Sequence, residues 1–281
     1  MTLILEKKNQ HPRDLRIKFV EEGHKYYIDG DDRYISATTF VHKWFPIFDV
    51  DKVSKQMVDT NNKRYAGMTC EEIKNKWNKE GKESAEKGSL MHLNIELFSN
   101  NEKVTDESVE FNQFLQFRKD HPNLIPYRTE WTIFDTDYRI AGSIDMIYYD
   151  KNDNSYNIYD WKRTKEFKIF SSENGYYPLQ HLPNTNQFHY FLQLNIYKHL
   201  LEKNYNIKIK DLYLCRCHPS NKDGYELLQA DDLSDEVNEI MKIRKEQVDK
   251  NIFELELPDS PISELSIKDE NIISRGVCLI D

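Results

Sequence analysis

The sequence predicts an α/β (α+β) protein in which strands and helices follow one another along a chain of 281 residues. Residues 141–150 and 155–162 are rich in Ile and Tyr, as strands are, and the polar residues 151–154 between them predict a hairpin turn. Amphipathic stretches on either side of this hairpin predict flanking helices. Hydrophobic residues make up 38% of the chain, so a packed core is expected although 31% of the residues are charged.

The N-terminal part predicts short elements. Residues 1–15 are polar, and we expect them to be poorly ordered. Residues 16–20 and 24–28 predict a small hairpin. The acidic turn at residues 29–32 lacks the length and the terminal Glu of an EF-hand loop, so it is interpreted as a turn. Ser36 is a good N-cap for a helix that ends before a proline at position 46.

Residues 49–82 form the basic part of the chain. The basic side chains are Lys52, Lys55, Lys63, Arg64, Lys74, Lys76, Lys79 and Lys82. Tyr65 and Trp77 lie among them, and Thr69 with Glu72 forms a capping box that predicts the start of a helix. Most charge runs are solvated helix faces. The alternative is a helical arch in which the basic side chains contact phosphates and the aromatic side chains stack on bases.

Residues 83–100 predict a helix in which Gly88, His92 and Glu96 are spaced by four and share a face. A glycine inside a helix costs ~1 kcal/mol relative to alanine, which indicates that something approaches closely at Gly88. A single histidine on a helix is usually hydrogen-bonded within the protein. From the spacing alone, His92 is therefore either a structural residue or a metal ligand.

The central hairpin carries two acids in a distinctive register. If Asp150 pairs with Ser155 across the turn, Asp145 lies directly opposite Asp160, and Lys162 shares a face with Asp160. Facing carboxylates destabilise a strand pair by up to ~1 kcal/mol, so a cation is expected between them. Two carboxylates with few other ligands suit Mg²⁺ or Mn²⁺. A neighbouring lysine can orient a water molecule or stabilise a phosphate.

The alternative is a solvated hairpin with scattered charges. It fits poorly, because Ile144, Met146 and Ile158 indicate strands buried in a sheet. Residues 127–134 predict a preceding strand, and a two-residue loop at 136–137 would place Glu130 opposite Ser143, on the face of the acids. Glu130 is then either an outer acid of the same site or an ordinary surface glutamate.

The remaining chain predicts helices and strands around this hairpin. Arg163, Lys165 and Lys168 form a basic edge beside the acids, and the loop at 171–183 is long enough to have a function or to be mobile. We expect helices at 106–119, 184–204 and 234–250 and strands at 211–218 and 225–229. The whole chain is expected to be one domain, with a hairpin and helical arch at 16–100, a catalytic core at 101–250 and a loosely attached tail at 251–281.

Net charge and cysteine content limit the classes of protein. A net charge of −9 argues against a protein that coats nucleic acid nonspecifically, and permits an enzyme with a local basic groove. The four cysteines give neither a disulfide framework nor a C-x-x-C pair, so an intracellular setting, cytoplasm or nucleus, is expected. No run is long and apolar enough for a transmembrane segment, so no membrane partner is expected.

The acids of the central hairpin lie in a familiar pattern. The string from Gly142 to Asp145, followed by Asp160 and Lys162, resembles the D…(D/E)-x-K core of the PD-(D/E)XK nucleases. Ser-Ile stands where the family name has Pro. The G-x-x-x-H-x-x-x-E string from Gly88 to Glu96 resembles the helix that precedes this core in RecB-type nucleases, which implies that His92 is a metal ligand and that Glu96 is a weaker candidate.

A further motif follows the core. Gln193 and Tyr197 match the Q-x-x-x-Y helix of the RecB-type enzymes. Four motifs thus lie in the family order between His92 and Tyr197. The chain is most similar to RecB-family exonucleases, including the mitochondrial genome-maintenance type and the CRISPR-associated nucleases of that family.

This resemblance implies a restriction-endonuclease-like fold, a mixed sheet flanked by helices. It also implies one or two Mg²⁺ or Mn²⁺ ions held by His92, Asp145, Asp160 and the Trp161 carbonyl, with Lys162 orienting the attacking water. Some relatives hold an iron–sulfur cluster through four cysteines. The cysteines here do not fit that pattern, so no cluster is expected.

The resemblance further implies that Gln193 and Tyr197 orient DNA near the metal, and Tyr190, Arg163 and Lys165 are expected to contact DNA beside them. The predicted activity is hydrolysis of single-stranded DNA by an exonuclease of replication, repair or recombination. The alternatives are an endonuclease that cuts branched or duplex DNA and a nucleic-acid-binding protein with a decayed nuclease fold.

Overall fold

A six-stranded sheet forms the centre of the protein in the computed structural model, which describes residues 4–257. Its strands are β3 (Ile35–Ser36), β4 (Leu124–Asp135), β5 (Ile140–Asp150), β6 (Ser155–Lys162), β7 (Ile209–Arg216) and β8 (Glu226–Gln229). The order is β3-β5-β6-β7-β8, and β4 pairs with the other edge of β5. The β3–β5 and β6–β7 pairs are parallel and the others antiparallel, so the predicted mixed sheet is confirmed.

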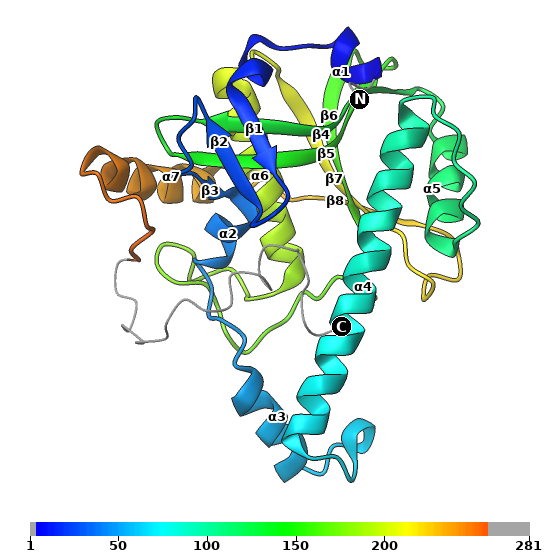
Figure 1. Cartoon of the computed structure of the whole chain (residues 1–281), viewed down its shortest axis with the longest axis vertical. Coiled ribbons are helices and arrows are strands. Elements are labelled where there is room, and N and C mark those ends of the chain that lie inside the picture. Colours follow the sequence, from blue (N-terminus) through cyan, green and yellow to red (C-terminus); the bar gives the residue numbers. More distant parts are fainter. Residues whose placement is uncertain (1–3, 258–281) are drawn as a thin grey trace.

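Helices cover both faces of this sheet (Figure 1). One face packs against α2 (Ala37–His42), α6 (Asn186–Asn204) and α7 (Ser234–Asp249), which bury apolar side chains with Ile144, Ile158 and Leu214. The other face packs against α4 (Cys70–Ser99) and α5 (Val109–Asp120), where Phe114 and Trp161 meet. Because side chains alternate along strands, β6 sends Ile158 to one core and Trp161 to the other. The restriction-endonuclease-like architecture expected from the sequence is therefore confirmed.

Helix α4 is a single helix of 30 residues, whereas the sequence predicts two helical stretches here. The predicted capping box of Thr69 and Glu72 is present at its start. Its N-terminal half extends beyond the sheet together with α3 (Val50–Asp59), as Figure 1 shows. These parts share a small core in which Trp77 Nε1 donates to the Tyr65 hydroxyl at 2.8 Å. Both rings are buried, so the expectation that Tyr65 and Trp77 stack on bases is wrong.

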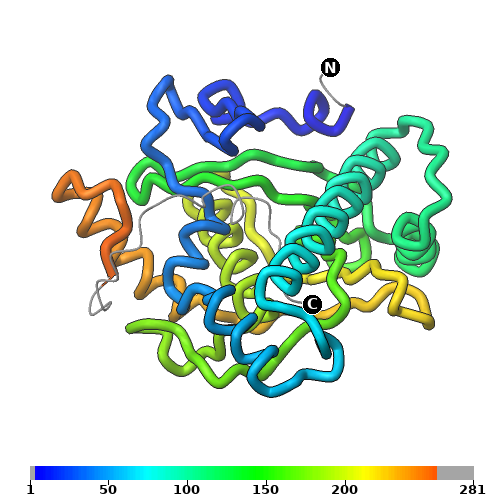
Figure 2. The backbone as a smooth tube through the Cα atoms, turned by 60° about the horizontal axis from the view of Figure 1, so that its bottom comes forward, coloured from blue at the N-terminus to red at the C-terminus, as the bar shows by residue number. Residues whose placement is uncertain are grey.

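The expectation of a disordered N-terminus is also wrong for residues 4–15. This segment forms α1 (Ile4–Lys8) and η1 (Pro12–Arg16), and Figure 2 shows it lying along the strands. Asp14 accepts from Arg128 and from the Trp131 indole, each at 2.8 Å, and both donors come from β4. The following residues form the predicted hairpin, β1 (Ile17–Val20) and β2 (Lys25–Ile28).

The β5–β6 register agrees with the prediction as far as Met146 and Tyr159, but the ladder ends there and the predicted pairing of Asp145 with Asp160 is not formed. Asp150 pairs with Ser155, and the ladder continues regularly to Met146 and Tyr159. The β4–β5 register does not agree. Asp135 Oδ1 accepts from the amides of residues 137 and 138 and closes a longer loop, so that Asp135 pairs with Ile140. Glu130 is therefore aligned with Asp145 instead of Ser143. The error is two residues, which leaves Glu130 on the expected face.

The C-terminal elements follow the predicted order. Residues 163–185 join β6 to α6 without a regular helix or strand, as expected for a long loop. Arg244 of α7 is buried and donates to the carbonyls of Tyr138 and Phe253, so the segment just after α7 is held against the body. The expectation of a loose tail from residue 251 is wrong up to Leu255, which is 8% exposed. Residues 258–281 lie outside the described part. In residues 4–257, none of the helices combines the length and apolar character needed to cross a bilayer.

Candidate active site

The site lies where one edge of β5 changes partner. At its start, β5 pairs through Ile140 and Ala141 with β3, and from Met146 onward the same edge pairs with β6. Between these pairings lie Gly142, Ser143, Ile144 and Asp145. The edge of β5 is therefore open over the motif that sequence analysis selected. Ile144 and Ile147 both face the α6 side, so the side-chain alternation slips here as in a bulge.

The Asp145 side chain lies where β5 and β6 no longer pair. Its Oδ2 accepts from the Trp161 amide at 2.8 Å, a contact that a regular ladder would give to a backbone carbonyl. The Trp161 carbonyl lies 2.9 Å from His92 Nε2, and His92 Nδ1 lies 3.6 Å from Asp145 Oδ2. The peptide groups around Trp161 thus fix the imidazole of α4 and the carboxylate of β5 relative to each other.

Glu130 joins these two residues. One ligand atom each from His92, Glu130 and Asp145 lies within 4.8 Å of the others. Glu130 Oε1 is 3.4 Å from His92 Nδ1, and Ser143 Oγ donates to Glu130 Oε2 at 3.1 Å. Glu130 has φ of 40°, a left-handed conformation that is unusual for a residue with a long side chain. Strain of this kind concentrates at functional sites.

Asp160 and Lys162 form the other part of the site. Asp160 Oδ2 lies 2.7 Å from Lys162 Nζ, and both side chains are largely buried. Asp160 does not join the compact group of His92, Glu130 and Asp145, so the predicted pair of metal-binding aspartates is only partly assembled. Tyr190 of α6 covers the ammonium group, with Nζ 4.4 Å from the ring centroid. Lys162 is thus held by a carboxylate and an aromatic face.

The crowding of charges shifts several pKa values. Burial, followed by the charge of Asp160, raises the pKa of Asp145 to about 7. Burial opposes the charging of His92, but the carboxylates of Asp145 and Glu130 outweigh it and raise the His92 pKa to about 9. Burial also opposes the charge of Lys162, yet Asp160 and Asp145 hold its pKa above the usual value. The imidazolium of His92 therefore offsets part of the acid repulsion.

The donor set fits a divalent cation. Two carboxylates and an imidazole within 4.8 Å suit Mn²⁺ and Mg²⁺, and the imidazole favours Mn²⁺ of the two. Burial, followed by the charge of Asp160, raises the pKa of Asp145, and a divalent cation would favour its charged form. His92 Nδ1 faces both carboxylates, while Nε2 lies 2.9 Å from the Trp161 carbonyl, a contact that fixes the orientation of the ring. These residues could hold such an ion.

The family is decided by a sequence profile described as the PD-(D/E)XK nuclease superfamily, which matches residues 39–263. The chain belongs to the PD-(D/E)XK nuclease superfamily. No curated protein matches it. It is also similar to a solved structure titled "Crystal structure of SSO0001", with 15% identity over 85% of this chain and 80% of the other and a TM-score of 0.34. The superfamily typically uses divalent metal ions, in keeping with the acid cluster.

In this PD-(D/E)XK chain, the Q-x-x-x-Y motif of α6 packs against the backbone of β5 next to the site. Tyr197 is 2% exposed, and its ring packs on Gly142, where an added Cβ would lie 2.6 Å from Tyr197 Cε1. Gln193 Nε2 donates to the Tyr197 hydroxyl and to Thr38 Oγ1 of α2, at 2.9 and 3.0 Å. The Tyr197 side chain offers no surface to DNA here. It supports the backbone of the motif that carries Asp145.

The basic residues Arg163 and Lys165, which follow β6, have different surroundings. Arg163 Nε donates to Glu110 Oε1 of α5 at 2.7 Å and its Nη1 donates to Ser84 Oγ of α4 at 3.1 Å. Both partners of the ion pair are about nine-tenths buried, so Arg163 joins elements of the protein and is not aimed at DNA. Lys165 is exposed, as a DNA contact requires.

Sequence reasoning missed several polar groups around the motifs. Ser143 could have been found, since it lies two residues before Asp145 in the same string. Thr38 and His42 come from α2, far away in the chain, and no local pattern marks them. His42 and His189 have ring centroids 5.2 Å apart, and burial, followed by the charge of Lys162, lowers the His42 pKa to about 4. His42 is thus a neutral imidazole near the lysine.

Glu96, the weaker metal-ligand candidate, lies one turn beyond His92. Burial, followed by the charge of Glu130, raises its pKa to about 7. It is outside the compact group of three.

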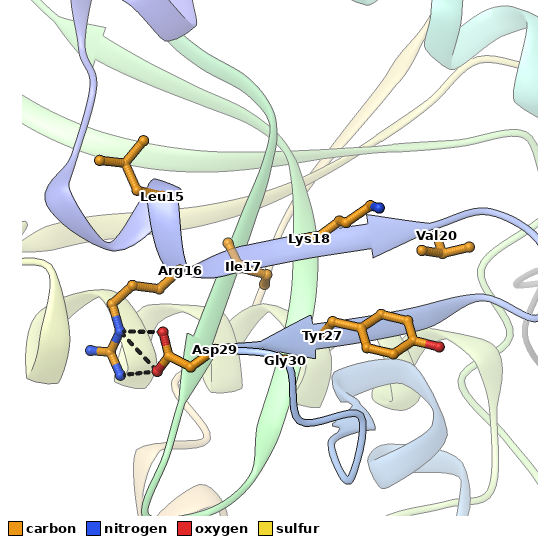
Figure 3. A pocket seen from close by; sticks show the side chains of 8 residues that line it. All are labelled: Leu15, Arg16, Ile17, Lys18, Val20, Tyr27, Asp29 and Gly30. Atoms are coloured by element: carbon orange, nitrogen blue, oxygen red, sulfur yellow. Dashed lines mark hydrogen bonds and ion pairs between the residues drawn. The ribbon is translucent and has the colours of Figure 1, made fainter.

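A separate concavity of the described part lies on the β1–β2 hairpin and shares no residue with the acid cluster. Figure 3 shows the ion pair of Arg16 and Asp29 at one end and Lys18 and Tyr27 along its wall. Leu15 is 81% exposed at its rim. Its lining brings together no group of acids or histidines, so it serves below as a control surface.

Proposed function

We propose that this protein is a metal-dependent deoxyribonuclease, and most specifically an exonuclease acting on single-stranded DNA. The observation that carries the proposal is the convergence of His92, Glu130 and Asp145 within 4.8 Å, beside the buried pair of Asp160 and Lys162. Three ligands for a cation next to one fixed ammonium group are what hydrolysis of a phosphodiester requires.

The residues divide the work. A bound Mg²⁺ or Mn²⁺ would polarise a phosphoryl oxygen and lower the pKa of a bound water. Asp145, Glu130 and His92 would hold the cation, and the Trp161 amide keeps the Asp145 carboxylate in place. Ser143 fixes the second oxygen of Glu130. Lys162 offers a positive charge to the phosphate as negative charge develops during attack.

Lys162 acts as a cation and not as a base. Its raised pKa keeps it protonated at neutral pH, and Asp160 holds the ammonium from one side. A proton released by the attacking water therefore goes elsewhere, to a carboxylate of the cluster or to solvent. The role of Asp160 in the proposal is to orient Lys162, with metal ligation as its second possible role.

The choice of single-stranded DNA and of cleavage from an end is based on the order of the motifs and on the helices beside the site. The order of the motifs from His92 to Tyr197 is that of RecB-type exonucleases. The N-terminal half of α4 and α3 extend past the site and carry exposed Lys52, Lys55 and Lys79, as a strand-covering arch would. An endonuclease would use the same chemistry, so the substrate decides between the two.

Cleavage of labelled DNA tests the proposal. With Mn²⁺ or Mg²⁺, the protein should shorten linear single-stranded DNA and leave circular single-stranded DNA intact. Asp160→Asn and Lys162→Ala should abolish the activity, whereas Asp32→Asn, a surface acid that pairs with Lys25, should not. Cleavage of the circle would show an endonuclease. Equal cleavage by wild type and the two site variants would exclude this site.

A further inference from the structure

The loop after β6 exposes a pair of apolar side chains close to the site. Phe170 is 85% exposed and Ile169 is 47% exposed. Single exposed apolar residues are common on protein surfaces. These two are adjacent, and they follow directly on the basic segment from Lys162 to Lys168 in a chain whose net charge is −9.

The base of this loop is fixed by α6. Asn186, which is 4% exposed, accepts from the Lys168 amide at 2.8 Å and donates to the Glu166 carbonyl at 3.0 Å. These contacts hold residues 166–168 against the first turn of the helix. The next two residues are directed to solvent from an anchored base, so the exposure of Phe170 is a property of the fold.

The rings of Tyr190 and Phe167 lie between Lys162 and the segment that leads to Phe170. Tyr190 lies over Lys162 Nζ at 4.4 Å, and Phe167 lies edge-on to Tyr190 at 6.4 Å. Phe170 is three residues farther along, a reach of at most ~10 Å of extended chain. The Phe170 backbone is therefore at most about 25 Å from the ammonium group, a distance that a few nucleotides can span.

We propose that Phe170, supported by Ile169, is a base-stacking platform that receives an unpaired strand leaving the site. The proposal rests on the proposed nuclease function and specifies its substrate. In a duplex the faces of the bases are covered by their neighbours, so an exposed ring stacks on an unpaired base without the cost of separating a base-pair step. Of the basic segment, Lys165 is exposed and Lys168 is half-buried beside the platform, and their charges suit contacts with phosphates. The loop thus supplies the aromatic contact that the buried Tyr65 and Trp77 cannot.

Binding of fluorescent oligonucleotides in EDTA tests the platform without cleavage. Phe170→Ala should weaken binding of a single-stranded oligonucleotide by about 5-fold or more, the size of one lost stacking contact. Phe170→Trp should retain the affinity. An oligonucleotide of the same length with abasic sites should bind wild type and Phe170→Ala equally. Leu15→Ala, equally exposed on the remote concavity, is the control and should bind like wild type.

The outcomes separate this proposal from the nuclease proposal. If wild type cleaves single-stranded DNA with Mn²⁺ while Phe170→Ala binds every oligonucleotide as wild type does, the platform is wrong and the nuclease stands. Loss of affinity for abasic and normal strands alike would also overturn stacking. Binding that depends on Phe170 without any cleavage by wild type would support the platform and contradict the nuclease. If RNA is bound as DNA is, the platform stands for an unpaired strand of either kind.

Discussion

The Trp161 amide donates a hydrogen bond of 2.8 Å to Asp145 Oδ2 at the point where β5 and β6 stop pairing. A side chain thus takes the place of a ladder partner. The contact turns the carboxylate toward His92 and holds it there. The geometry of the site follows from this opening in the sheet, and so do the predictions below.

Removal of the Lys162 charge should separate catalysis from folding. Lys162→Met is expected to lower kcat by about 10²–10³-fold, because the phosphate loses its fixed cation. It should also lower the thermal midpoint, because Asp160 is left buried without its ammonium partner. The double variant Asp160→Asn/Lys162→Met should regain stability and remain inactive. Recovery of activity in the double variant would contradict the assigned role.

Gly142 should not tolerate a side chain. An added Cβ would lie 2.6 Å from the Tyr197 ring, so Gly142→Ala is expected to destabilise the fold by about 1–3 kcal/mol in denaturant unfolding. Gly88→Ala is the matched control, because nothing lies within 4 Å of its added Cβ, so the close approach expected at Gly88 is wrong for this structure. It should leave stability unchanged or raise it by up to ~1 kcal/mol. Equal effects of the two changes would argue against the packing of Tyr197 on Gly142.

The metal-free protein should lose stability as the pH rises from 5 to 9. The folded-state pKa of Asp145 is about 7, above its ordinary value, so folding favours its protonated form and that gain is lost up to pH 7. The folded-state pKa of His92 is about 9, so its contribution is present below pH 6.5 and is lost as the pH approaches 9. Thermal unfolding in EDTA measures the trend. Asp145→Asn should flatten it, and an unchanged slope in that variant would count against the coupling.

Binding of Mn²⁺ should release protons for the same reason. His92 must lose its proton to become a ligand, so calorimetry in buffers of different ionisation enthalpy is expected to show proton release at pH 7. The affinity should fall as the pH is lowered. His92→Gln should reduce the number of released protons, and release that is the same in wild type and variant would exclude His92 as a ligand.

Arg163 should behave as a structural residue. Replacement by methionine leaves Glu110 buried and unpaired, and is expected to cost up to about 3 kcal/mol of stability. Glu110→Gln should have a similar effect. The salt dependence of DNA binding by the folded Arg163→Met protein should equal that of wild type. A salt slope reduced by about one would instead indicate a phosphate contact.

The sequence was sufficient to predict the central hairpin. Residues 151–154 are polar and predict a short turn, and with Asp150 paired to Ser155 this turn gives the observed pairing from Asp150 to Met146. The β4–β5 turn was misjudged because the Asp135 side chain accepts from two backbone amides and closes a longer loop. Such side-chain contacts are invisible in the hydrophobic pattern from which strands are predicted.

Errors about the N-terminus and the arch have a common cause. Asp14 is held by hydrogen bonds from Arg128 and Trp131, which lie more than 100 positions away in the sequence. No local sequence pattern indicates partners at that distance. Tyr65 and Trp77 looked available for stacking because they stand among lysines, yet they bury each other in a small core. His92 was predicted as a metal ligand from the order of the motifs, because the helix pattern alone does not distinguish a ligand from a structural histidine.

The position of a bound Mn²⁺ ion tests the central claim most directly. Crystals grown with Mn²⁺ and measured for anomalous scattering should show a peak within ~2.3 Å of Asp145 and His92, with Glu130 beside it. The same peak should vanish in Asp145→Asn crystals. An ion bound elsewhere, or a Mn²⁺ peak that persists in Asp145→Asn crystals, would contradict the proposal that the opening between β5 and β6 forms a metal centre.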